Sequence, residues 1–257
     1  MISIERQAAV PETLNSVAVR NAQAAIRAAA TGSKPGGELF KSLWGSDDVR
    51  RAVSVMQFRK CGYCERIRDH NRESDVEHFR PKAGVTEVPR HKGYWWLAYE
   101  WKNLLFSCRH CNQQYKMNYF PVPDELYRAE SESDDLDLER AYLIDPTSED
   151  PEPYFTYDWV SEPDRVWIQP ARDDERARIT IQILRLNRDD LLVERGTVVE
   201  TLSAVAATMT VARHRMAQWA IDEARVAIRK LTEPKCTFAG LRRFYFRSVG
   251  LGKYIYP

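Results

Sequence analysis

The sequence predicts an α+β fold that is mostly α-helical, with a compact central block between two helical regions. Three observations support this expectation. Apolar residues recur at helical spacing near both ends of the chain. A block over residues 61–121 is dense in Cys, His, Trp and Asn. Short runs rich in aromatic and β-branched residues follow it, as is typical of strands.

The N-terminal region is expected to be helical. Residues 13–30 are rich in alanine, with apolar residues at helical spacing, and Gly36-Gly37 ends the pattern. A second helix is expected over residues 46–58, because Ser46-Asp47-Asp48 is typical of a helix N-terminus. This helix would lead the chain directly to Cys61.

The central block and the C-terminal region combine strands and helices. A strand is expected over residues 76–79 and a helix beginning near Cys111. From Asp174 onward the pattern is helical again, in a long amphipathic stretch that reaches about Leu231. Between these regions, aromatic and β-branched runs predict short strands at residues 141–144, 154–159 and 166–169.

The chain is expected to divide into three parts: a helical segment over residues 1–55, a core over 56–125, and a region over 126–257 that is continuous with the core. The composition, 44% hydrophobic, is ordinary for a protein with a real core. The apolar runs are too short or too interrupted to span a bilayer, and the N-terminus lacks a signal-peptide pattern. A cytoplasmic location is therefore expected.

The charges are segregated along the chain although the formal net charge is only +1. Residues 50–122 contain 14 Lys and Arg against 7 Asp and Glu, whereas residues 123–152 contain 12 acidic residues against 2 basic ones. A basic block of this kind favours contact with a nucleic acid. The acidic run over residues 130–140 is interpreted as a solvated loop or helix face, and the alternative is a regulatory or DNA-mimicking segment.

Four of the five cysteines form two Cys-x-x-Cys pairs, Cys61 with Cys64 and Cys108 with Cys111. Two such pairs supply the four thiolates of a closed, structural zinc site. The alternative is a pair of redox dithiols or buried free thiols. His110 lies between two of these cysteines and is not expected to be a ligand. The fifth cysteine, Cys236, is interpreted as a small core residue.

A closed zinc site has no open coordination position, so any chemistry must come from other residues. Glu77-His78 lies between the two cysteine pairs, and Asn103 and Asn112 lie close to the second pair. A carboxylate beside a histidine suits phosphodiester hydrolysis. The carboxylate binds a divalent cation, and the imidazole takes a proton from the attacking water.

These motifs resemble the HNH nucleases: an acid–His dipeptide at a strand end, an Asn in the following loop, and Cys-x-x-Cys-Asn-x-x-x-Lys opening a helix. The resemblance implies a ββα-metal, treble-clef-like core. It further implies that Glu77 and Asn112 bind one catalytic Mg²⁺ or Mn²⁺, that His78 is the general base, and that Asn103 fixes the loop that orients His78. Glu77 replaces the more usual Asp, and Asn112 replaces the final His.

A second resemblance covers residues 55–195. The segments HFRPK, GYWWLAY, WKNL, LIDP and LNRDDL, which begin at residues 78, 93, 101, 143 and 186, look like the PtuB-type HNH subunits of bacterial anti-phage Septu and retron systems. The resemblance implies that the chain is a nuclease effector and that an ABC-type ATPase of the PtuA kind is its partner.

Candidate nucleic-acid contacts lie around the acid–His pair. Phosphate contacts are assigned to Arg80, Lys82, Arg109 and Lys116, of which Lys116 is favoured because it lies one helical turn after Asn112. The aromatic run at residues 94–96 is interpreted as core, with base stacking as the alternative.

The leading hypothesis is a metal-dependent endonuclease that cleaves DNA within a complex. The first alternative is a zinc-containing module that binds nucleic acid or protein and is catalytically silent. A second alternative is a nuclease subunit whose C-terminal helices dock on the ATPase and which stays inactive until assembly. Nothing in the sequence encodes base readout or selects between DNA and RNA.

Overall fold

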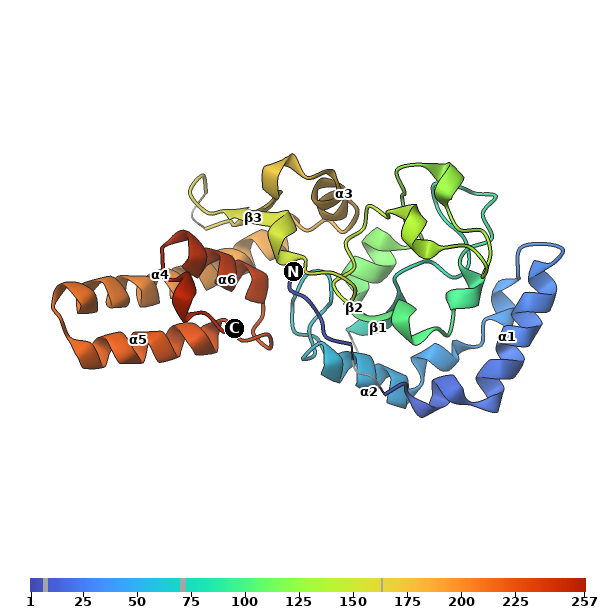
Figure 1. Ribbon diagram of the computed structural model, residues 1–257, viewed down its shortest axis with the longest axis horizontal. Coiled ribbons are helices and arrows are strands. Elements are labelled where there is room, and N and C mark those ends of the chain that lie inside the picture. Colours follow the sequence, from blue (N-terminus) through green and yellow to red (C-terminus); the bar gives the residue numbers. More distant parts are fainter. Residues whose placement is uncertain (7–8, 70–72, 163) are drawn as a thin grey trace.

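The computed structural model describes the chain except for residues 7–8, 70–72 and 163. Helices and short strands are mixed along an elongated molecule (Figure 1). The helices are α1 (Val17–Ala30), α2 (Asp47–Met56), α3 (Glu175–Ile183), α4 (Asp189–His214), α5 (Gln218–Leu231) and α6 (Ala239–Ser248). The strands are β1 (Ser74–His78), β2 (Leu104–Cys108), β3 (Phe155–Asp158) and β4 (Trp167–Pro170).

The two N-terminal helices form where the sequence predicts them, with small differences at their ends. Helix α1 begins at Val17 rather than at residue 13, because Ser16 accepts a hydrogen bond from the Val19 amide and caps the helix there. The preceding turn, Glu12–Asn15, is hydrogen-bonded to α2 instead. Asp48 of α2 accepts hydrogen bonds from the amide and the hydroxyl of Thr13 at 2.9 and 2.8 Å.

Strands β1 and β2 form an antiparallel pair in the middle of the molecule, with Glu77 opposite Leu105 and His78 opposite Leu104. Both faces of the pair are buried. Leu104 and Phe106 pack into the cluster formed with α1 and α2, whereas Leu105 and Cys108 pack into the cluster shared with the C-terminal region. The pair therefore connects the two hydrophobic clusters.

The strand expected at residues 141–144 is not formed. Side chains of α3 take up its backbone groups in place of a neighbouring strand. Arg176 donates to the carbonyl of Ala141 at 3.0 Å, and the Thr180 hydroxyl accepts from the Ile144 amide at 3.2 Å. The other two expected strands form the antiparallel pair β3–β4.

The long amphipathic stretch that was expected to reach Leu231 is interrupted. Helix α4 ends at His214, Met216 adopts a left-handed φ of 54°, and α5 runs back along α4. The resulting α4–α5 hairpin projects from the body of the molecule (Figure 1). Helix α6, which the sequence pattern did not predict, closes the core near the base of this hairpin through Leu241 and Phe246.

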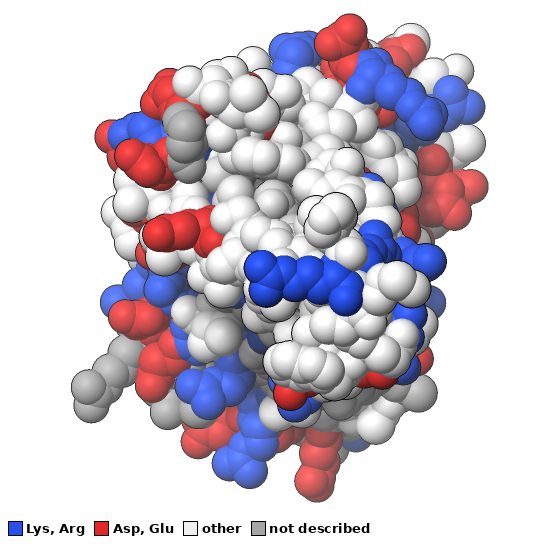
Figure 2. Space-filling model, turned by 90° about the vertical axis from the view of Figure 1, so that its left-hand side faces the viewer, with Lys and Arg blue, Asp and Glu red and all other residues white. Residues whose placement is uncertain are grey.

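At the hairpin end of the molecule, a broad uncharged area covers the upper middle of the surface, Lys and Arg side chains cross below it, and other charged side chains lie toward the edges (Figure 2). Exposed apolar residues of the hairpin include Val211, Met216, Trp219 and Val226. Within the described residues, no helix has the length and apolar character needed to cross a membrane.

Candidate functional site

The four cysteines of the two Cys-x-x-Cys pairs come together in one buried cluster. Their sulfur atoms all lie within 4.8 Å of one another, and the sulfurs of Cys64 and Cys108 are 3.8 Å apart. Because zinc–sulfur bonds are about 2.3 Å long, four thiols gathered this closely fit a metal such as zinc. The donor chemistry and the burial both agree with a closed metal centre.

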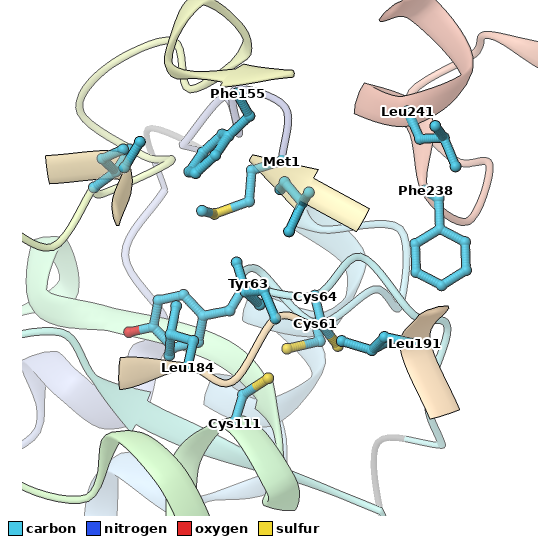
Figure 3. Packing of buried hydrophobic residues seen from close by; sticks show 14 of the residues in the cluster. Met1, Cys61, Tyr63, Cys64, Cys111, Phe155, Leu184, Leu191, Phe238 and Leu241 are labelled. Atoms are coloured by element: carbon cyan, nitrogen blue, oxygen red, sulfur yellow. The ribbon is translucent and has the colours of Figure 1, made fainter. Parts of the chain in front are cut away.

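Backbone contacts shape the two turns that carry these cysteines. The Glu65 amide donates to the Cys61 carbonyl at 3.0 Å, and the Cys111 amide donates to the Cys108 sulfur at 3.5 Å. Apolar side chains from the C-terminal region, Leu184 and Leu191, lie next to the cluster (Figure 3). Water is therefore kept away from the sulfurs.

His110 and the fifth cysteine, Cys236, lie outside this cluster. His110 is exposed to solvent. Cys236 is only half-buried, and its thiol donates to the Lys230 carbonyl at 3.3 Å, so the expectation of a core cysteine was wrong. It lies beyond the end of α5, where the turn leading to α6 leaves the thiol partly open.

Glu77 lies in β1 with its carboxylate buried. The ammonium of Lys116 is 2.7 Å from Oε1, and the Tyr63 hydroxyl donates to the same oxygen at 3.4 Å. Burial raises the pKa of Glu77, although Lys116 acts in the opposite direction. Lys116 is 0% exposed and also donates to the His78 carbonyl at 3.0 Å. In this structure it is engaged inside the protein and is not free at the surface for phosphate.

His78 is buried at the end of β1, and its ring is held in one orientation. Nε2 lies 2.9 Å from the Ala98 carbonyl. Since a carbonyl can only accept, Nε2 carries the proton and Nδ1 is the basic nitrogen of the neutral ring. Burial, followed by the nearby charge of Lys82, lowers the pKa of His78 well below its usual value. The ring packs edge-to-face with Trp44 at a centroid distance of 5.0 Å.

The side chain of Asn103 forms hydrogen bonds with two backbone segments near this histidine, one at Arg80 and one at Leu97. Its Oδ1 accepts from the Arg80 amide at 2.8 Å, and its Nδ2 donates to the carbonyls of Arg80 and Leu97 at 3.0 and 3.2 Å. Leu97 precedes Ala98, whose carbonyl holds the ring of His78. Asn103 therefore fixes the relative position of two segments that meet at the imidazole.

Asn112 lies in the short helix η6 (His110–Lys116), which follows β2. Its amide nitrogen donates to Asp75 at 3.1 Å, and Gln113 donates to the same carboxylate oxygen at 2.8 Å. The described contacts include none between Asn112 and Glu77. Asp75 is thus a further candidate residue, which the sequence interpretation did not assign. The sequence could have indicated Asp75, because it lies two residues before Glu77 and residues two apart in a strand share one face.

The donors around the end of β1 fit a hard divalent cation in chemical type. The carboxylates of Asp75 and Glu77 and the amide oxygen of Asn112 are oxygen ligands that Mg²⁺ and Mn²⁺ prefer. In this structure Lys116 provides the positive charge at Glu77. A cation at Glu77 would therefore compete with an internal ammonium.

The other residues expected to contact phosphate differ in exposure. Arg109 is exposed. Lys82 is partly buried, with its ammonium 4.5 Å from the centre of the Trp44 ring. Arg80 donates to the buried carboxylate of Glu139 at 2.8 Å, so its charge is balanced within the protein. Arg109 is the most accessible cation of the predicted set.

The aromatic run and the acidic segment meet at Glu139. Tyr94 is fully buried, in agreement with its assignment to the core, and its hydroxyl donates to Glu139 at 2.6 Å. Trp95 and Trp96 are partly buried against the two hydrophobic clusters. Since the Ala129 amide also donates to Glu139, the acidic segment is anchored to the core next to Arg80.

Two curated proteins are similar to this chain. The Septu protein PtuB of Bacillus mycoides (strain KBAB4) is 30% identical over 212 residues, which cover 79% of this chain and 68% of that protein. The Septu protein PtuB of Bacillus thuringiensis is 36% identical over 72 residues, which cover 28% of this chain and 24% of that protein. No family model matches the chain.

Proposed function

The chain belongs to the Septu PtuB family, and we propose that it is a metal-dependent HNH endonuclease that hydrolyses phosphodiester bonds in DNA. The observation that carries this proposal is the environment of His78. The ring is buried, burial lowers its pKa, the Ala98 carbonyl holds Nε2, and the residue follows the buried carboxylate of Glu77 in β1. A fixed, neutral imidazole beside an acid is what a general base requires.

The local architecture supports an HNH core of the ββα-metal type. The antiparallel strands β1 and β2 are followed at once by η6, and the cysteine cluster holds the end of β2 and the start of η6 in place. Metal binding at the cysteines would stabilise this arrangement without taking part in the reaction, because four thiolates leave no open position.

In the proposed mechanism, Nδ1 of His78 takes a proton from the attacking water while Nε2 keeps its hydrogen bond to Ala98. Asn103 holds the loop that carries this carbonyl. Glu77 and Asn112 would hold a Mg²⁺ or Mn²⁺ ion, which when bound would stabilise negative charge on the scissile phosphate and on the leaving 3′ oxygen. Cleavage in this way leaves a 5′-phosphate and a 3′-hydroxyl.

Substrate affinity is proposed to come from phosphate contacts. Arg109 is exposed directly after β2, and Lys82 lies four residues after His78. Contacts of this kind neutralise phosphates and are independent of base sequence. Arg80 and Lys116 would join them only by leaving Glu139 and Glu77, the acids with which they are paired.

A role in anti-phage defence together with a PtuA-like ATPase partner is proposed from the family resemblance. The α4–α5 hairpin supports a protein partner, because it projects from the body and exposes Met216 by 87% and Trp219 by 71%. Apolar side chains exposed to this degree at a projecting tip are typical of contact surfaces.

A second function, a zinc-containing binding subunit that is silent alone, is favoured by one observation. Glu77 is closed off by Lys116, and Asn112 is directed toward Asp75. A subunit that is inactive until a partner or nucleic acid rearranges these contacts would look the same in isolation. The two functions therefore differ in whether the purified chain cleaves DNA.

Plasmid nicking by purified wild-type protein and by His78→Ala, with and without Mg²⁺ or Mn²⁺, tests the proposal. His214→Ala is the matched control, since His214 is exposed at the end of α4. Loss of the general base should lower the rate about 10²–10⁴-fold, whereas the control should cleave like wild type.

If wild type and His78→Ala nick equally with metal, the assignment of His78 is wrong. If folded, zinc-loaded wild type does not nick DNA with either metal, the autonomous nuclease is excluded and the silent binding subunit is favoured. Adding the ATPase partner then separates a partner-activated nuclease from a protein that only binds.

A further inference from the structure

The LNRDDL segment, residues 186–191, comprises the end of the connection from α3 and the first turn of α4, and it lies beside the four-cysteine cluster. Leu191 lies to one side of Cys61 and Cys64, and Leu184, just after the end of α3, lies near Tyr63 in the same hydrophobic cluster (Figure 3). Asn187 secures the start of the segment, because its amide exchanges two hydrogen bonds of 2.9 Å with the backbone of Ile168 in β4. The segment is thus held rigidly against the metal centre.

The side chain of Arg188 is directed from this segment at the cysteine cluster. Its Nη1 lies 3.8 Å from the sulfur of Cys111, and its guanidinium carbon is 5.6 Å from the centre of the Tyr115 ring. Only 10% of the side chain is exposed. The guanidinium is therefore enclosed between the sulfurs and an aromatic ring of η6.

Arg188 makes few conventional hydrogen bonds for a buried guanidinium. Nη1 also donates to the carbonyls of Leu184 and Arg185 at 3.4 and 3.3 Å. In the described part of the chain, Nε and Nη2 are buried without a hydrogen-bond partner, and Nε forms an ion pair of 3.0 Å with Asp190, a 43% exposed carboxylate that is shared with Arg66. Burying an arginine in this way is costly unless a negative charge compensates it.

Asp190 supplies part of that charge but is shared with Arg66, and four thiolates around one zinc ion would supply the rest on the other side of the guanidinium. Zinc contributes two positive charges and each thiolate one negative charge, so the filled centre keeps about two negative charges. We propose that Arg188 is the counter-charge of the four-cysteine metal centre, so that the C-terminal region supplies an electrostatic component of a site whose ligands lie in the core.

Other buried cations close to the cluster have different partners. Lys60, next to Cys61, is paired with Glu65 at 3.2 Å and donates to the Cys236 carbonyl at 3.0 Å. Arg195 donates to the Val166 carbonyl at 3.4 Å. Arg188 is the cation in direct contact with a cluster sulfur among the contacts described.

The same segment also holds the other cysteine turn. Arg66, two residues after Cys64, donates to Asp190 at 2.5 Å and is paired with Glu194 of α4. The C-terminal region therefore contacts both Cys-x-x-Cys turns, one through Arg66 and one through Arg188. The role of Arg188 does not depend on the nuclease proposal, because it concerns only the cysteine centre.

Zinc release from the full-length, zinc-loaded protein to a chromogenic chelator tests this inference. Arg188→Met removes the charge and keeps most of the volume, and Arg188→Lys keeps the charge. Arg185→Met is the control, because Arg185 is an exposed arginine of the same connection. Residues that support metal ligands typically change metal affinity about 10–100-fold, so Arg188→Met should release zinc at least ~10-fold faster, with a smaller change in Arg188→Lys.

Release at the wild-type rate by folded Arg188→Met would overturn the inference, as would wild-type protein that contains no zinc. Should Arg188→Met fail to fold, Arg188→Gln replaces it in the same assay. Folding rescued by excess zinc supports a role at the metal. If neither neutral variant folds at any zinc concentration and Arg188→Lys, which keeps the charge, does not fold either, the side chain serves packing alone, and the inference is contradicted.

Discussion

The cysteine centre and the acid–His site lie on the same small ββ unit but differ in how complete they are. All four sulfurs of the cysteine centre already face one another within 4.8 Å. At the acid–His site, Glu77 is paired with Lys116, and Asn112 is bonded to Asp75. Within the described residues, the cysteine cluster is the one group of three or more Cys, His, Asp and Glu side chains placed to hold a metal.

This difference follows from the chemistry of the donors. Buried thiols form only weak hydrogen bonds, so few protein groups compete with a metal for them. Carboxylates and amides are strong hydrogen-bonding groups and must be paired when they are buried. A structural metal centre can therefore be recognised from its ligands alone, whereas the residues proposed to bind an exchangeable cation are occupied by internal partners.

The largest effect is expected at the cysteine centre. Cys64→Ser removes one of four ligands, and because structural zinc contributes roughly 10–16 kcal/mol to small zinc domains, the variant should lose its bound zinc and its cooperative thermal unfolding. Circular dichroism and metal analysis measure this. Cys236→Ser is the control, since Cys236 lies outside the cluster, and an equal loss in both variants would contradict the assignment.

A smaller effect is expected from Lys116→Met at the acid–His site. Breaking a buried ion pair on one side costs about 3–5 kcal/mol, because the carboxylate of Glu77 is left without its partner. Mn²⁺ should restore part of this stability and should bind more tightly to the variant than to wild type. Chemical unfolding with and without Mn²⁺ tests this, with Lys102→Met, an exposed lysine, as the control. Failure of Mn²⁺ to stabilise the variant would show that the cation does not replace Lys116.

Asn103→Ala removes the amide that connects Arg80 and Leu97. Three hydrogen bonds are lost and backbone groups are left unpaired, so the free energy of unfolding should fall by about 1–3 kcal/mol. Cleavage should fall more than stability does, because His78 loses its fixed orientation. A variant that unfolds more easily yet cleaves like wild type would limit Asn103 to a role in stability.

The smallest effect concerns pH and His91. Its Nε2 donates to the Ala129 carbonyl at 3.0 Å, and its Nδ1 accepts from the Gly93 amide at 3.0 Å, which only the neutral ring can do. Burial lowers the pKa of His91 below the usual 6.5, so the unfolded chain binds the proton more readily than the folded one.

Stability should therefore decrease as the pH falls below about 6.5, where the unfolded state gains protons first. His91→Gln, whose amide does not titrate, should show a flatter dependence between pH 7.5 and 5. Denaturant unfolding of both proteins across this range measures the difference. Parallel curves would mean that His91 does not contribute to the pH dependence.

The sequence allowed the cysteine centre and most helices to be predicted, because ligand spacing and helical periodicity are local signals. The break after His214 was missed, since the left-handed turn at Met216 has no glycine or proline to mark it. The predicted strand at residues 141–144 failed because α3, distant in sequence, bonds to its backbone.

The contacts of the acid–His site were harder to predict than its residues. The pairing of Lys116 with Glu77 depends on how closely η6 packs against β1. The spacing of residues along η6 alone does not reveal this packing. The same limit applies to Arg188, 77 positions from Cys111 along the chain, whose role emerges only once the C-terminal region is packed on the core.

The most direct test of the account is whether the two sites bind different metals for different purposes. After gel filtration into metal-free buffer, which removes weakly bound cations, zinc content, circular dichroism and plasmid nicking should be measured on the same sample. We predict that about one zinc per chain and the fold persist, while nicking is lost and returns with Mg²⁺ or Mn²⁺ alone. Loss of zinc together with nicking, and recovery of both only with zinc, would contradict the account.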